Sequence, residues 1–172
     1  MLQDSCCKKI VLVAVVFLLC LPRLSAAAGC AATEPDASGV QGAPLAYGPR
    51  WFGSTHLAAL LPAKGKWTGN GPENHYKGKF WWWREGFDAK IEPFPQLEVS
   101  AHLRDDPVVT AQVSRAASSS NSKWNAMLVI MRFPEHGCWQ VSGQYDGEEL
   151  IFMLSVGQEP PKSNDSWPQI RD

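Results

Sequence analysis

The sequence lacks the patterns that would indicate a helical protein. Beyond residue 29, no stretch of ten or more residues repeats apolar side chains at helical spacing between helix caps. A block of like charge is also missing, since 16 lysines and arginines stand against 17 aspartates and glutamates. Without residues 1–29, which contain Lys8, Lys9, Arg23 and Asp4, there remain 13 basic and 16 acidic residues. That balance gives nucleic-acid binding no support.

Patterns of catalysis and metal binding are missing too. The four histidines show neither His-x-His nor His-x-x-x-His spacing, and Cys-x-x-Cys does not occur. Cys138 would need a nearby base to act as a nucleophile, but the residue expected opposite it is Ser155. We therefore expect no enzyme, no cofactor and no metal site, with a cryptic hydrolase as the most distant alternative. Its carboxylates would come from a dispersed set in turns and on polar faces: Glu92, Glu98, Asp105, Asp106, Asp146, Glu148 and Glu149.

The N-terminal 29 residues have the pattern of a secretory signal peptide. Lys8 and Lys9 precede an unbroken apolar run over residues 10–21, which is too short to cross a bilayer as a helix. Ala26-x-Ala28 fits an ordinary signal-peptidase site. Residues 27–30, Ala-Ala-Gly-Cys, also resemble a bacterial lipobox, although alanine stands where leucine is usual. We predict a lipoprotein that is lipidated at Cys30 and anchored outside the cytoplasmic membrane, with a soluble secreted protein as the alternative.

Residues 30–46 are rich in alanine, glycine and proline, a composition that predicts a flexible tether. The state of the cysteines depends on how the signal is cut, because Cys6, Cys7 and Cys20 leave with it. Lipidation of Cys30 would make Cys138 a free thiol without a partner. If Cys30 is not lipidated, it can form a disulfide with Cys138.

Residues 47–157 contain short strand-like runs separated by turn signals. Strands are expected over about 55–61, around Trp67, and over 79–84, 97–104 and 108–115. Apolar and polar residues alternate strictly over 97–104, which indicates a strand buried on one face. Residues 116–123 are expected to form a Ser/Asn-rich loop, and residues 158–172 a loose tail.

The strongest local signal is a hairpin over residues 127–156. Asp146-Gly147 stands between two strand-like runs, and Asp-Gly suits a type I′ turn because both central positions require positive φ. Closing the hairpin there puts one set of cross-strand pairs on an apolar face: Gly143–Leu150, Val141–Phe152 and Trp139–Leu154. About seven such strands predict an all-β fold, an antiparallel Ig-like β-sandwich in the architectural sense, since the Cys…Trp…Cys pattern of antibody domains is absent.

Residues 133–143, Phe-Pro-Glu-His-Gly-Cys-Trp-Gln-Val-Ser-Gly, followed by Leu-Ile-Phe at 150–152, resemble the C-terminal signature of uncharacterised bacterial secreted proteins and lipoproteins. In that family a Phe-Pro-x-x-Gly-Cys-Trp-x-Val-x-Gly segment closes a small Ig-like β domain. Trp51-Phe52-Gly53 and residues 82–84, Trp-Trp-Arg, are similar in order. The resemblance implies a β fold and a location in the cell envelope, but no activity.

Eight tryptophans suggest that aromatic rings contact a ligand or a partner. Successive residues in the run at 79–84 alternate sides, so Trp81 and Trp83 face away from Phe80 and Trp82. We expect a non-enzymatic envelope module that binds an envelope protein or a surface polymer, with carbohydrate binding as the nearest alternative. The candidate contact residues are Trp67, Trp81, Trp82, Trp83 and Trp124.

Overall fold

The structure is a computed structural model that describes residues 29–44, 50–68, 76–121 and 124–157. In this part of the chain two β-sheets pack face to face, and the helical turns are two short 3-10 turns, η2 (Ala37–Gly39) and η4 (Ala63–Gly65). The described residues contain no helix long and apolar enough to cross a membrane. The predicted all-β sandwich is therefore confirmed. The predicted signal peptide (1–28 of its 29 residues) and the predicted tail (158–172) lie outside the described residues.

One sheet has six strands. Five follow the order β1-β2-β4-β9-β7, and the sixth, β8, also pairs with β9. The other has five strands in the order β3-β11-β10-β5-β6. All pairings are antiparallel except that of β3 with β11. The first sheet comprises β1 (Trp51–Gly53), β2 (Ala58–Leu60), β4 (Tyr76–Trp83), β7 (Gln112–Val113), β8 (Ala117–Asn121) and β9 (Trp124–Phe133); the second comprises β3 (Lys66–Thr68), β5 (Glu98–Leu103), β6 (Asp106–Thr110), β10 (Gly137–Tyr145) and β11 (Glu148–Gly157).

The hairpin of β10 and β11 has the predicted register. Asp146 and Gly147 form its loop with φ of 52° and 82°, as a type I′ turn requires. Val141 pairs with Phe152 and Trp139 with Leu154, and all four side chains are buried between the sheets. Because a shift of one residue would turn this apolar set toward solvent, burial and turn chemistry fix the same register.

Three predictions of secondary structure need correction. The first expected strand, over about 55–61, is shorter than predicted: it is β2 over residues 58–60, which pairs Leu60 with Trp51 of β1. The strand expected over 108–115 is divided between the two sheets, as β6 over 106–110 and β7 over 112–113. The predicted loop over 116–123 is β8 over residues 117–121, which pairs with β9 from Ala117–Leu128 to Asn121–Trp124. Serine and asparagine have low strand propensity, but pairing with a long neighbouring strand overrides that preference.

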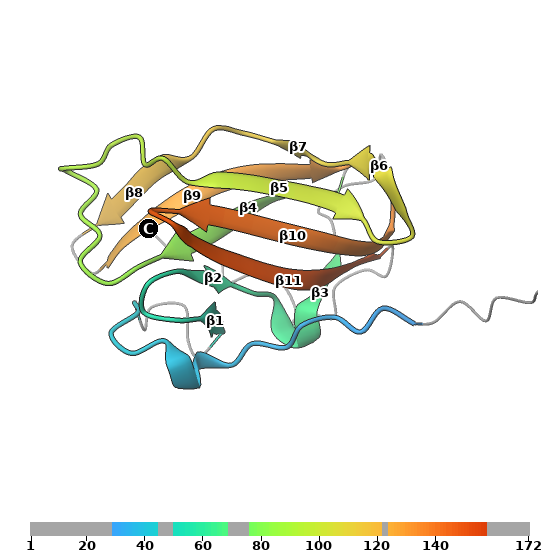
Figure 1. Cartoon of the computed structure of the whole chain (residues 1–172), viewed down its shortest axis with the longest axis horizontal. Coiled ribbons are helices and arrows are strands. Elements are labelled where there is room, and N and C mark those ends of the chain that lie inside the picture. Colours follow the sequence, from blue (N-terminus) through green and yellow to red (C-terminus); the bar gives the residue numbers. More distant parts are fainter. Residues whose placement is uncertain (1–28, 45–49, 69–75, 122–123, 158–172) are drawn as a thin grey trace, which may run out of the picture.

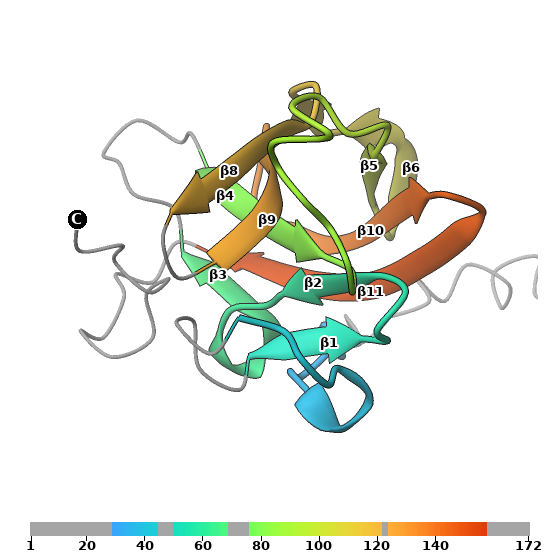
Figure 2. The ribbon, with the colours of Figure 1, turned by 90° about the vertical axis from the view of Figure 1, so that its left-hand side faces the viewer.

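Residues 29–44, which we call the N-terminal strap, are packed against the sandwich, and the prediction of a free tether over 30–46 is wrong for them. Thr33 exchanges two hydrogen bonds with Met153 of β11, its N–H donating to the Met153 carbonyl (2.9 Å) and its Oγ1 accepting from the Met153 N–H (2.9 Å). Further along, Asp36 forms an isolated bridge with Phe52 of β1. The strap thus runs from the edge of one sheet to the edge of the other (Figure 1), and η2 lies directly beneath β1 in Figure 2.

The strap also covers a second hydrophobic core. The main core between the sheets contains Phe80 and Trp82, while Trp81 and Trp83, which point the other way from β4, join Trp51 in a smaller cluster. Val40 and Ala43 of the strap are buried in this smaller cluster. The indole N–H of Trp51 donates to the carbonyl of Pro44 (3.2 Å). Both faces of β4 are therefore buried from Phe80 to Trp83, while Lys77 and Lys79 remain exposed.

Candidate binding site

The tryptophans proposed as ligand contacts are not available for that role. Trp67, Trp81, Trp82 and Trp83 are only 4, 5, 0 and 6% exposed, respectively. The predicted alternation of the β4 side chains is correct, but the strap covers the face that would otherwise meet solvent. Neither a sugar nor a partner can stack on these rings in this conformation, because stacking needs an exposed ring face. Trp124 begins β9, and its side chain lies outside the described part of the chain.

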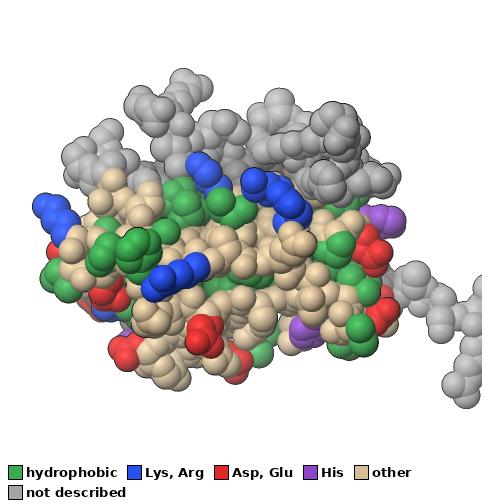
Figure 3. Space-filling view, turned by 90° about the horizontal axis from the view of Figure 1, so that it is seen from above, with side chains coloured by type: hydrophobic (Ala, Val, Ile, Leu, Met, Phe, Trp, Pro, Cys, Tyr) green, Lys and Arg blue, Asp and Glu red, His purple; other side chains and the backbone are tan. Residues whose placement is uncertain are grey.

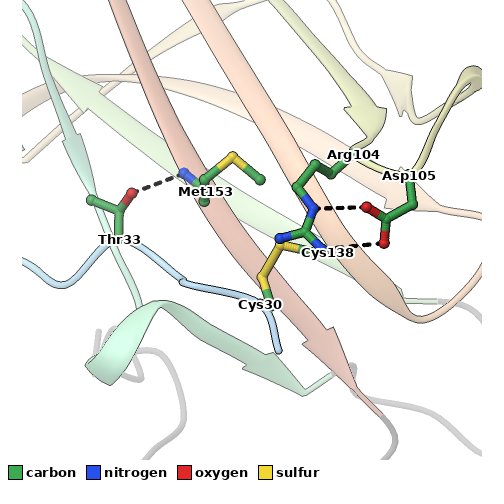
Figure 4. Close-up of a disulfide and its surroundings, with 6 residues drawn as sticks. All are labelled: Cys30, Thr33, Arg104, Asp105, Cys138 and Met153. Carbon is green, nitrogen blue, oxygen red and sulfur yellow. Dashed lines mark hydrogen bonds and ion pairs between the residues drawn. A yellow bond between two sulfur atoms is a disulfide. The ribbon is translucent and has the colours of Figure 1, made fainter. Parts of the chain in front are cut away.

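Cys30 and Cys138, which are 108 positions apart in sequence, form a disulfide that joins the strap to β10, with Cα atoms 5.2 Å apart (Figure 4). The expectation of a free thiol at Cys138 is therefore corrected, and the pairing is the alternative that the sequence left open. A sulfur atom in a disulfide cannot also carry a lipid through a thioether. In the disulfide-bonded form, Cys30 is therefore not available for lipidation.

A polar cluster fastens the connection between β4 and β5, which is the long loop at the end of the sandwich that carries the β10–β11 turn. Arg84 forms a 2.6 Å ion pair with Glu92, and the Tyr145 hydroxyl donates to the other oxygen of the Glu92 carboxylate. The Arg84 guanidinium also lies over the Tyr145 ring, 5.3 Å from its centroid. Ser118 of β8 donates its hydroxyl to the Glu92 carbonyl and its N–H to the Pro93 carbonyl (3.1 Å). This loop is therefore tied to both sheets.

The electrostatics of this cluster support a structural role. Partial burial and the hydrogen bond to Glu92 raise the pKa of Tyr145 above its ordinary value, and Arg84 opposes this only in part. Partial burial alone would lower the pKa of Arg84, but the Tyr145 hydroxyl and the Glu92 carboxylate outweigh it and raise that pKa. The tyrosine thus stays a neutral donor and the arginine stays a cation. Arg84, Glu92 and Tyr145 bind one another, so this cluster offers no free acid or base.

A groove of about 510 Å3 lies beside β5. Figure 3 shows the molecule from above, with its side chains coloured by type. One wall is the stretch from Pro95 to Ser100, with Ser142 and Gln144 of β10 next to it, and the other is the segment 113–115. The walls diverge because the chain leaves β6 for the other sheet. There the Ser114 N–H donates to the Ile130 carbonyl, and the Ile130 N–H to the Ser114 hydroxyl, both at 2.9 Å. Charged side chains are scattered across this view without one dominant sign.

The N-terminal half of β5 is an open sheet edge within the groove. β10 pairs with β5 from Glu98 to Leu103, but β6 pairs only with His102 and Leu103 on the other side. The Ala101 carbonyl accepts from the Ala111 N–H (3.0 Å) on that same side. Main-chain groups two residues apart in an antiparallel strand point the same way, so Val99 also directs its N–H and carbonyl away from β10. No strand of the described residues pairs with Val99 there.

An acidic hollow of about 390 Å3 continues from the groove and shares Gln96, Glu98 and Gln144 with it. Its acidic lining consists of four exposed residues: Glu98, Asp146, Glu148 and Glu149. Ser142 and Gln144 hold the Glu149 carboxylate through hydrogen bonds of 3.2 and 3.3 Å. The cation of the adjoining groove is Arg115, whose guanidinium lies 5.1 Å from the centroid of the Phe94 ring. The combined site is therefore acidic at the β10–β11 turn.

Comparison with known proteins provides no family for this chain, since no protein-family model matches it and no curated protein matches it significantly. In the described residues, no three histidines, cysteines or carboxylates are grouped to hold a metal ion. The arrangement of the site, an open strand edge beside fixed carboxylates, suits the binding of a chain molecule. Sequence reasoning missed this site because it depends on where the chain crosses between sheets, although Glu98, Asp146, Glu148 and Glu149 were noted as dispersed carboxylates.

Proposed function

We propose that this protein is a non-enzymatic module that works outside the cytoplasmic membrane and binds a protein or a surface polymer of the cell envelope. The observation that carries the proposal is the groove beside β5. There the sheet edge at Val99 is unpaired, and hydrogen bonds from Ser142 and Gln144 hold the nearby Glu149 carboxylate in place. The binding surface is therefore the groove and not the buried tryptophans.

The disulfide supports the location. Disulfides persist in oxidising compartments outside the cytoplasm and are rare within it. Together with the signal-like N-terminal segment, the Cys30–Cys138 bond favours export across the cytoplasmic membrane. Because that bond occupies the Cys30 sulfur, the proposal does not require a lipid anchor at Cys30.

Site-specific photo-crosslinking in the producing cell tests the proposal. A benzophenone amino acid replaces Ser100, which is exposed and lines the groove, or Lys79, which is exposed on β4 in the other sheet. We expect a crosslinked product from position 100 and none from position 79. The product is identified by mass spectrometry, and the purified partner must form the same adduct in vitro and be displaced by unmodified protein. Equal labelling from both positions, or no adduct at position 100, would contradict the proposal.

A further inference from the structure

We propose that the occupant of the groove is an extended peptide segment bearing lysine or arginine, which adds to β5 as a further strand. This inference rests on the proposed function and specifies the partner's chemistry. Main-chain hydrogen bonds to an open edge provide sequence-tolerant affinity in this mode of recognition, while side-chain pockets provide specificity.

The open edge determines which residues of β5 the added strand can pair with. Val99 presents an N–H and a carbonyl on the side where β6 has already left, and Ala101 uses its carbonyl there for Ala111. The free part of the edge therefore lies toward the N-terminal end of β5. From Leu97 to Ala101 a strand extends roughly 13 Å, so about four residues of the peptide meet β5 directly.

The charge of the hollow selects the side chains of the occupant. Glu98 lies on β5 itself, while Glu149 comes from β11 on the far side of β10, where Ser142 and Gln144 hold its carboxylate; Asp146 and Glu148 lie further along. Arg115 is already placed over Phe94 at the groove. Lysine or arginine at alternate positions of the peptide would extend long side chains across β5 toward Glu98 and the carboxylates of the hollow, whereas an acidic peptide or nucleic acid would be repelled.

A second copy of this chain fits the edge less well. In an antiparallel pairing of two β5 strands centred on Val99, the open stretches of both copies would meet, but β5 (Glu98–Leu103) carries no lysine or arginine to face the acidic hollow of the other copy. A parallel pairing would bring the two acidic hollows together, and like charges in contact are unfavourable. The occupant that the edge and the charge both favour is therefore a basic peptide segment.

The test uses the disulfide-bonded protein as isolated after export and a capped nonapeptide of alternating threonine and lysine. We expect the peptide to slow hydrogen exchange of the Val99 amide at least tenfold at saturation. A peptide with glutamate in place of lysine should have no effect. Methylating one alternate set of peptide nitrogens should abolish binding, while methylating the other set is tolerated, because only one set faces β5.

Charge variants provide the matched control. The double substitution Glu98→Gln/Glu149→Gln should weaken binding about three- to thirtyfold, since each exposed ion pair contributes modestly. Glu34→Gln/Glu135→Gln, two exposed carboxylates outside the groove, should leave it unchanged. No protection of Val99 at millimolar lysine peptide, or equal protection by the glutamate peptide, would overturn the inference. If photo-crosslinks nevertheless form at position 100, the binding module stands and only the peptide is wrong; if they also fail, both proposals fall.

Discussion

The Tyr145 side chain connects the β10–β11 hairpin to the β4–β5 loop, and its ionisation makes the stability of this connection depend on pH. Its ring is buried, while its hydroxyl donates to Glu92 beside Arg84. A hydrogen bond to a charged group contributes about 1.5–3 kcal/mol when it is well shielded, and the partial exposure of Glu92 reduces that value. Tyr145 thus holds the long β4–β5 loop from the β10 side.

We predict that Tyr145→Phe lowers the free energy of unfolding by about 1 kcal/mol at neutral pH. The pKa of Tyr145 is raised in the folded protein, so its stabilisation is complete below the ordinary tyrosine pKa of about 10 and is lost as pH rises through the folded value. Urea unfolding from pH 7 to 11 should therefore show the wild type and the variant converging above about pH 10. Parallel curves over this range would contradict the role given to the hydroxyl.

The β10–β11 hairpin and β4 are in contact at Gly143, where the Trp82 ring lies against the hairpin backbone. A Cβ at position 143 would lie 2.4 Å from the Cη2 and Cζ3 atoms of that ring, which is fully buried and cannot move aside freely. Gly143→Ala should therefore destabilise the fold by about 1–3 kcal/mol in urea unfolding. Gly157→Ala, on β11 with open space around the added carbon, should change stability by less than about 0.5 kcal/mol. Equal effects would mean that the two elements pack differently.

The elements that could be predicted from sequence are those specified by neighbouring residues. Asp146-Gly147 and the alternation around it determined the hairpin register, and the strict alternation over 97–104 located β5 with Leu97 and Ala101 in the core. β8 could not be predicted, because its serines form a strand only when β9 is beside them. The groove could not be predicted either, since it arises because the chain leaves β6 for β7 in the other sheet, which separates residues 113–115 from β5.

In the molecule as a whole, the N-terminal strap changes both the fold and the function expected from sequence. Its composition predicts flexibility, but contacts with residues more than a hundred positions away, at Cys138 and Met153, hold it in place. Through Val40 and Ala43 it covers Trp81 and Trp83 on the outer face of β4, and this removes both rings from any binding surface. The sequence located these tryptophans correctly on opposite faces of a strand, yet it could not show what covers the second face.

The disulfide should account for a large part of the stability of this arrangement. Cross-linking residues 108 positions apart restricts the unfolded chain, and loss of such a bond typically costs about 2–5 kcal/mol. Cys138→Ser should lower the free energy of unfolding by that amount and should increase hydrogen exchange at the Thr33 amide, which bonds to Met153. In the wild type isolated without reductant, Cys30 and Cys138 should resist alkylation until a reductant is added. If Cys30 instead incorporates labelled fatty acid while Cys138 is alkylated without reduction, the protein is a lipoprotein and the disulfide form is wrong.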